Sequence, residues 1–119
     1  MVVRHLDSYP MSKDRLLTLL EYLEDKPEDS FLLFAVAKEY EQRDDLSQAL
    51  THFLKLKTVD PEYIGLYYHL GKLYENINED HHAIATYNQG IALAKKIGDF
   101  HALSELNNSM TNLKLQLGN

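Results

Sequence analysis

Two groups of side chains with the same helical spacing are the strongest candidates for binding chemistry in this 119-residue chain. Phe34, Lys38 and Glu41 stand at positions i, i+4 and i+7, so they lie on one flank of a helix. The same chemical order returns further along the chain, in Tyr68, Lys72 and Glu75. An aromatic ring beside an ammonium group suits a short protein segment that offers a carboxylate and an apolar side chain.

A simpler interpretation of these residues needs no ligand. Each lysine and the glutamate three positions after it have the spacing of an exposed intrahelical ion pair, which is worth a few tenths of a kcal/mol. The two aromatic residues would then pack against a neighbouring helix. Both interpretations require helices that present the three residues on one side.

A 34-residue repeat organises the elements that must carry these side chains. Eight pairs of positions match at this offset, and nearly every pair keeps its size class, for example small residues on small ones and aromatic residues on aromatic ones. The pairs are Pro27/Pro61, Glu28/Glu62, Leu33/Tyr67, Val36/Leu70, Ala37/Gly71, Tyr40/Tyr74, Ala49/Ala83 and Phe53/Tyr87. Apolar residues recur at i, i+3, i+4 and i+7 within each unit, which predicts amphipathic helices, and no segment alternates as a half-buried strand does.

Turn and capping residues divide the chain into the parts of one helical domain, residues 1–119. The expected parts are an N-terminal helix over 12–25, a first repeat over 28–59, a second repeat over 61–97 and a capping helix or partial third repeat over 99–117. Asp60 and Pro61 are expected to open a helix as its N-cap and first residue. The other expected N-caps are Ser12, Asp44 or Asp45, and Asn78.

The charge of the chain is unevenly distributed. The formal net charge is −6, and residues 21–45, with nine acids and three bases, account for all of it. Such a chain lacks the positive surface that phosphate groups require, so we expect neither nucleic acid nor a membrane as partner. No apolar stretch approaches the ~20 residues that span a bilayer. We interpret the acidic stretch as a solvated outer face, with contact to a basic partner as the alternative.

Residue types suited to catalysis or to a cofactor form no recognisable arrangement. The chain contains no cysteine, which excludes a thiolate metal site. His81 and His82 are sequence neighbours and diverge on a helix, while His101 and Glu105 are only two ligands at helical spacing. The glycines occur singly, so no phosphate-binding loop is present. We therefore expect no metal, no cofactor and no enzymatic activity. Residues 1–10 lack the apolar core of a secretory signal, and we expect a cytoplasmic protein.

The packing residues resemble the signature of the tetratricopeptide repeat. One copy comprises Tyr67, Leu70, Gly71, Tyr74, Ala83 and Tyr87, and the other comprises Leu33, Val36, Ala37, Tyr40, Ala49, Phe53 and Pro61. The resemblance covers about residues 30–97. It implies an all-α fold, a right-handed solenoid of α-hairpins in which two tetratricopeptide-like repeats are flanked by an N-terminal half-repeat helix and a C-terminal capping helix.

The resemblance also implies a concave face, built mainly from the first helix of each pair, that binds a partner. The residues expected on it are Phe34, Lys38, Glu41, Tyr68, Lys72 and Glu75, with Asn108 and Asn112 from the last helix. We therefore expect an adaptor or scaffold that binds a protein or peptide with a carboxylate. The alternative is a module that self-associates as a homodimer through apolar residues of its end helices, namely Leu16, Leu20, Leu23, Leu113, Leu115 and Leu117.

Overall fold

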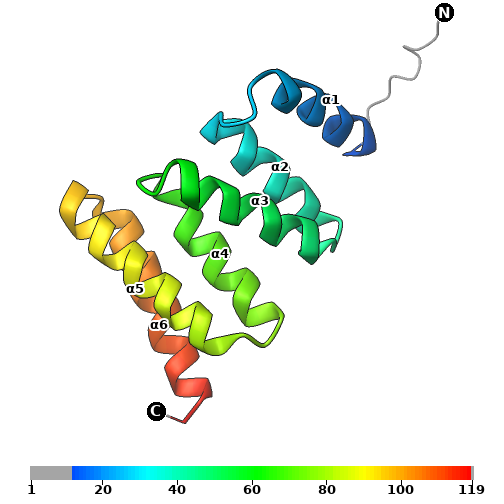
Figure 1. Cartoon of the computed structure of the whole chain (residues 1–119). Helices are drawn as coiled ribbons and strands as arrows, with labels where there is room; N and C mark the ends of the chain where they lie inside the picture. The colour runs from blue at the N-terminus through cyan, green and yellow to red at the C-terminus, as the bar shows by residue number, and fades with distance from the viewer. Residues whose placement is uncertain (1–11, 119) are drawn as a thin grey trace, which may run out of the picture. The chain divides into compact units, whose positions relative to one another are not determined.

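The computed structural model describes residues 12–118, with side chains from Arg15 onward, and contains six α-helices (Figure 1). They are α1 (Ser12–Asp25), α2 (Ser30–Gln42), α3 (Leu46–Val59), α4 (Gly65–Asn76), α5 (Asp80–Ile97) and α6 (Phe100–Gln116). The described residues include no strand, so the predicted all-α helical-repeat fold is confirmed. The side-chain cap expected at Ser12 and the expectation for residues 1–10 lie outside the described part of the chain.

The helices belong to two compact units that meet in sequence at Asp60 and Pro61. In the first unit, α2 packs against both α1 and α3. In the second unit, α5 packs against both α4 and α6, and α4 also contacts α6. None of the described helices is both long enough and apolar enough to cross a membrane.

Small residues bring the helices of the first unit close together. Ala37 of α2 and Ala49 of α3 are fully buried, and the ring of Phe53 is buried beside them. The apolar core of this unit consists of Leu33, Val36, Ala37, Ala49, Phe53 and Leu56. Most of these residues belong to the pairs that match at the 34-residue offset, and the others lie on the same helix faces as those residues.

Two glycines permit even closer packing in the second unit. A Cβ atom on Gly71 of α4 would overlap the ring of Tyr87 on α5. A Cβ atom on Gly90 of α5 would lie 2.6 Å from Cβ of Tyr67 and 2.9 Å from Leu106 of α6. Since contacts below 3.0 Å require the neighbours to move, α4, α5 and α6 can pack this closely only around glycine.

Three helices end in the same left-handed turn. The turn residues are Asp44, Asn78 and Gly98, with φ angles of 64°, 63° and 76°. The residue after each turn residue donates its backbone N–H to the carbonyl five residues before it. These bonds run from Asp45 to Tyr40, from Glu79 to Tyr74 and from Asp99 to Ala94. This pattern satisfies carbonyl groups that a helix end would otherwise leave unpaired. Aspartate, asparagine and glycine are the residues that adopt such a φ most readily.

The turn geometry corrects the predicted helix starts. The side chains of Asp29, Asp45 and Asp99 accept N–H bonds from the first turn of their helices, so Asp45 is the N-cap and Asp44 is not. Asn78 is likewise a turn residue, and Glu79 occupies the N-cap position of α5.

The expected start of a helix at Pro61 is also wrong, because α4 begins at Gly65. The carboxylate of Asp60 accepts a hydrogen bond from the hydroxyl of Ser30 at 2.5 Å instead of capping a helix. The carbonyl of Pro61 accepts one from the hydroxyl of Tyr67, also at 2.5 Å. Both polar groups at the expected start are therefore engaged in side-chain hydrogen bonds, Asp60 with α2 and Pro61 with α4 itself.

Candidate functional site

The first strip, which we define as Phe34, Lys38 and Glu41, lies on α2 in the first unit. The ammonium nitrogen of Lys38 is 5.8 Å from the centroid of the Phe34 ring, within the range of a cation–π contact. The ring of Phe34 also packs edge-on against Phe53, with centroids 6.2 Å apart. Burial raises the pKa of the Glu41 carboxyl, and the nearby Lys38 charge partly offsets that rise. Phe34 therefore belongs both to the strip and to the packing of α2 on α3.

The second strip, Tyr68, Lys72 and Glu75, lies on α4 in the second unit and repeats this geometry. The ammonium nitrogen of Lys72 is again 5.8 Å from the centroid of the aromatic ring, here that of Tyr68. The same nitrogen is 3.9 Å from a carboxylate oxygen of Glu75. The ion pair that the simpler interpretation predicts thus occurs in this strip, together with a lysine–aromatic contact.

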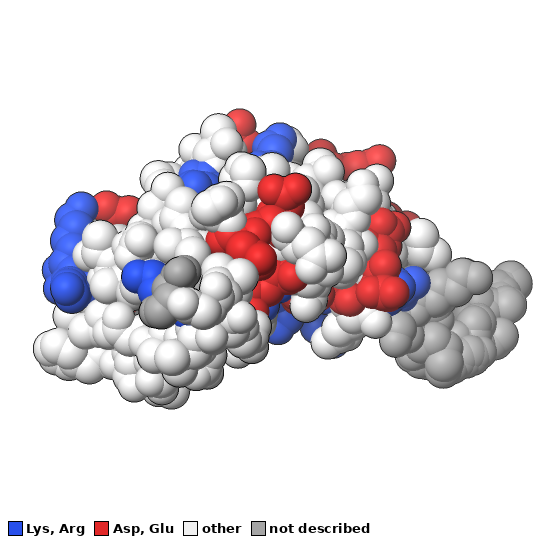
Figure 2. Space-filling model, turned by 90° about the horizontal axis from the view of Figure 1, so that it is seen from below, with Lys and Arg blue, Asp and Glu red and all other residues white. Residues whose placement is uncertain are grey.

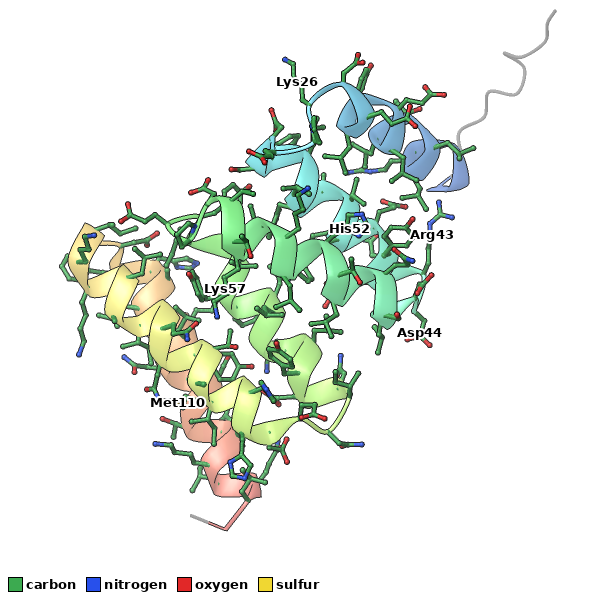
Figure 3. The ribbon with its side chains drawn as sticks, in the orientation of Figure 1. Lys26, Arg43, Asp44, His52, Lys57 and Met110 are labelled. Carbon is green, nitrogen blue, oxygen red and sulfur yellow. The ribbon has the colours of Figure 1, made fainter. Side chains whose placement is uncertain are left out.

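Asn108 and Asn112 lie exposed on α6, one helical turn apart. Figure 3 labels Met110, which lies between them in sequence, on the same helix. Both amides belong to the same unit as the second strip. Their participation with the two strips in one binding face stays a prediction.

Sequence reasoning missed a buried hydrogen-bond chain behind the second strip. The hydroxyl of Tyr87, on α5, donates to a carboxylate oxygen of Glu75 at 2.5 Å. It also hydrogen bonds with the side chain of Ser109 on α6, which is buried. Burial, followed by the bond to Glu75, raises the pKa of Tyr87 far above its ordinary value. The sequence signal for these hydrogen bonds was Ser109, a polar residue on the helix face of the buried Leu106 and Leu113.

A second missed feature is a buried carboxylate between α1 and α2. Glu39 is only 4% exposed, and its carboxylate oxygens lie 3.2 Å from Nε of Arg15 and 3.5 Å from Nε of Arg43. Figure 3 labels Arg43 near the end of α2. Glu39 was expected on a solvated acidic face, which is wrong for this residue. The sequence signal for its burial was that Glu39 matches Leu73, which lies 34 residues later and is buried.

The rest of the acidic stretch is mainly exposed. Figure 2 shows one face of the molecule, on which aspartate and glutamate side chains gather in patches. The exposed acids between residues 21 and 45 are Glu21, Glu24, Asp25, Glu28, Asp44 and Asp45. Their exposure agrees with the solvated face that the sequence predicts.

The apolar residues expected at the ends of the array differ in exposure. Leu115 is 69% exposed and Leu117 is 42% exposed, whereas Leu113 is buried. Leu16, Leu20 and Leu23 of α1, which packs against α2, are half-buried. Leu113 is therefore part of the core of the second unit and is not available to a second copy.

Comparisons with known proteins agree with this architecture. The model of the tetratricopeptide repeat family matches residues 64–97, which span α4 and α5. No curated protein matches the chain significantly. The structure of the TPR2B domain of yeast Sti1 in its pHsp70 complex has a TM-score of 0.82 at 14% identity, with 88% of this chain and 84% of that chain covered. At that identity the likeness shows the fold alone.

A more similar sequence belongs to a tetratricopeptide repeat domain protein from Salinibacter ruber. Its crystal structure is 44% identical in sequence, with a TM-score of 0.70, and the match covers 73% of this chain and 97% of that chain. A solution structure of a Salinibacter ruber tetratricopeptide repeat domain protein matches at 45% identity over 73% of this chain and 88% of that chain, with the same TM-score of 0.70. With this identity and coverage, and with the repeat geometry described above, the chain belongs to the tetratricopeptide repeat family.

Proposed function

We propose that the chain is an adaptor without catalytic activity that binds a protein segment through its two lysine–aromatic strips. Protein–protein interaction is the general role of tetratricopeptide repeat domains. The observation that carries the proposal is the repeated geometry, in which an ammonium group stands 5.8 Å from an aromatic ring in each unit. A core-packing role alone gives no reason for a lysine at both positions.

The chemistry of the strips defines the segment that suits them. Lys72 is 37% exposed, so its ammonium group remains accessible although Glu75 lies nearby. Phe34 and Tyr68 are half-buried and offer part of their apolar surface. A segment with a carboxylate for the lysine and an apolar side chain for the ring fits both groups, and Asn108 and Asn112 supply further amide donors.

Selection from a displayed library of random peptides tests this proposal. Enriched peptides are synthesised, and their affinity is measured by calorimetry for the wild type and for the K38E, K72E and K38E/K72E variants. We expect enriched sequences with an acidic and a large apolar residue. Each lysine-to-glutamate substitution reverses a charge and removes a charge-assisted hydrogen bond to the peptide. It should therefore weaken peptide binding by at least about tenfold.

A matched control separates local contacts from the overall charge. Lys55 of α3 and Lys95 of α5 are exposed and belong to neither strip, so K55E/K95E makes the same change in net charge. We expect K55E/K95E to bind the selected peptides nearly as tightly as the wild type. Equal losses in both double variants, or no loss in K38E/K72E, would contradict the proposal.

Self-association through the C-terminal helix is the second candidate function. The observation that favours it is the exposure of Leu115 and Leu117 near the end of α6. Repeat arrays require a polar outer face on their terminal unit for solubility, so apolar side chains at such an end favour cover by a further helix. A second copy of this chain would supply such a helix without any other partner.

A further inference from the structure

A hollow of about 310 Å³ lies in the second unit, between the beginning of α4 and the beginning of α6. Tyr68 and His69 line it from α4, and His101, Glu105 and Leu106 line it from α6. Asp99, the N-cap of α6, completes the polar part of the lining. The volume is at the lower limit for ligand sites in proteins, which suits a single long side chain better than a cofactor.

Two carboxylates line the hollow, one of which, that of Asp99, also accepts the N–H of Ala102 as the N-cap of α6. Asp99 and Glu105 are carboxylates, and none of the described residues that line the hollow is a lysine or an arginine. The side chain of Glu105 is exposed, so it stands where an arriving cation meets it first. Among the described residues no three metal-ligating side chains converge, so the lining does not have the donor set of a metal site. The hollow is therefore complementary to an organic cation.

The rings and the apolar floor of the hollow narrow the choice of cation. The two ring side chains of the lining that α4 contributes, Tyr68 and His69, offer flat surfaces on which a delocalised cation can stack. Tyr68 and His69 meet edge-to-face, with centroids 5.3 Å apart, so the two rings form a corner. A planar guanidinium group stacks on such rings and bonds a carboxylate with two parallel N–H groups, whereas an ammonium group does neither. The apolar stem of the same side chain suits the half-buried Ile64 and Ala102 of the lining.

We propose that this hollow takes an arginine side chain of the bound protein segment. The inference rests on the proposed function, since it names a second group on the partner that the strips are proposed to bind. Tyr68 belongs to both features, because it lines the hollow and contacts Lys72. A segment with an arginine close to its carboxylate matches the two features together.

A titration with blocked amino acids followed by NMR tests the hollow directly. N-acetyl-arginine methylamide is added to the ¹⁵N-labelled full chain, and N-acetyl-norleucine methylamide serves as the uncharged control of similar length. We expect the arginine compound to cause saturable shifts at the backbone amides of Tyr68, His69 and Glu105, and the norleucine compound to cause none. No saturable shift with arginine, or equal shifts with both compounds, would overturn the inference.

Two variants with the same charge change locate the contact. Glu105 is exposed, so E105Q retains the fold and removes one carboxylate from the hollow. Glu79 is exposed in the same unit but does not line the hollow, which makes E79Q the matched control. We expect E105Q to weaken binding of the arginine compound by about threefold or more and E79Q to leave it unchanged. Equal affinity of E105Q and the wild type would also overturn the inference.

The test of the arginine subsite and the test of the proposed function can fail independently. If the arginine compound fails to bind while selected peptides still depend on Lys38 and Lys72, only the arginine subsite is wrong. If the compound binds the hollow but no peptide depends on the lysines, the subsite stands and the strips lose their proposed role.

Discussion

One hydroxyl group distinguishes the two repeats at a buried position. Phe53 and Tyr87 occupy matching positions of the two repeats, and both rings are fully buried. Tyr87 donates a hydrogen bond to Glu75, and burial together with this bond raises its pKa above the ordinary value, so the hydroxyl keeps its proton. The hydroxyl therefore links the second strip to the core of its own unit, which Phe53 cannot do for the first strip.

The substitution Tyr87→Phe should lower the free energy of unfolding by about 1–3 kcal/mol, because it leaves the partly buried Glu75 carboxylate without its donor. The ring itself should remain in place, since phenylalanine occupies the matching position in the first repeat. Urea denaturation monitored by circular dichroism measures the change. Tyr22→Phe, at a tyrosine that is 59% exposed, is the control and should leave stability unchanged. Equal urea midpoints for Tyr87→Phe and the wild type would show that the bond contributes nothing.

The Glu41 carboxyl should make the stability of the protein dependent on pH. Burial raises its pKa above the ordinary value of 4.5, with Lys38 opposing the rise. The native state thus holds this proton to a higher pH than the unfolded state does. The contribution to stability is fully present below pH 4.5 and is lost as the pH rises through the raised native pKa.

The Glu41→Gln variant isolates this contribution. Glutamine has no proton to release, so the difference in unfolding free energy between the variant and the wild type should grow in favour of the variant as the pH rises from 4.5 towards 7. Urea midpoints at several pH values measure it. A difference that stays constant over this interval would mean that the native pKa of Glu41 is not raised.

The sequence predicted that each aromatic residue and its lysine share one helix flank, because this placement depends on one helix alone. Phe34 and Lys38 are four residues apart, so any α-helix brings them together. The bond between Tyr87 and Glu75 joins residues on two different helices. It depends on the depth at which α5 packs on α4, which spacing within a helix does not determine.

Polar packing at the scale of the element distinguishes α2 from α4. Glu39 of α2 matches Leu73 of α4, and Arg43, the C-cap of α2, matches Ile77, the C-cap of α4. The carboxylate of Glu39 is shared between Arg15 of α1 and Arg43. Where a carboxylate is buried between two arginines, loss of the acid leaves the cations without a counter-charge.

We expect Glu39→Leu to destabilise the protein by about 1–3 kcal/mol, because Arg43 is only 28% exposed and loses its partner. The double variant E39L/R43I, which reproduces the residues of α4, should lie within about 1 kcal/mol of the wild type. Urea denaturation of both variants measures the difference. If the double variant were less stable than Glu39→Leu, the arginine would stabilise α2 by some other contact.

Helix boundaries were predictable where the capping bond is local. Asp45 and Asp99 each bond an N–H group three residues ahead, and sequence patterns describe such bonds well. Asp60 has the same capping ability, yet its carboxylate accepts from Ser30, which is 30 residues away in sequence. This competing tertiary partner explains why α4 does not begin where Asp60 and Pro61 suggested.

At the scale of the whole molecule, the proposed adaptor role predicts a monomer. Light scattering coupled to size-exclusion chromatography should give the monomer mass from micromolar to sub-millimolar concentrations. Leu115 and Leu117 are exposed, so L115E/L117E retains the core and removes the apolar end of α6. A dimer mass in the wild type that this variant abolishes would instead favour self-association.

The repeat fold follows from the sequence because its packing residues recur with one period. Leu33, Val36 and Ala37 are all buried, as are their counterparts Tyr67, Leu70 and Gly71. The binding face is less predictable, since its residues are selected by a partner and the repeat period carries no information about that partner. The hollow beside Tyr68 illustrates this limit, because its lining comes from two helices of different repeats.

The left-handed turns at Asp44, Asn78 and Gly98 have a consequence for synthesis on the ribosome. Each turn closes through a bond between residues five apart, so a hairpin needs no distant segment in order to form. Chains dominated by such neighbouring contacts fold quickly, and N-terminal portions fold first as they emerge. We expect the helices before Asp60 to reach their native arrangement while the ribosome is still adding the remainder.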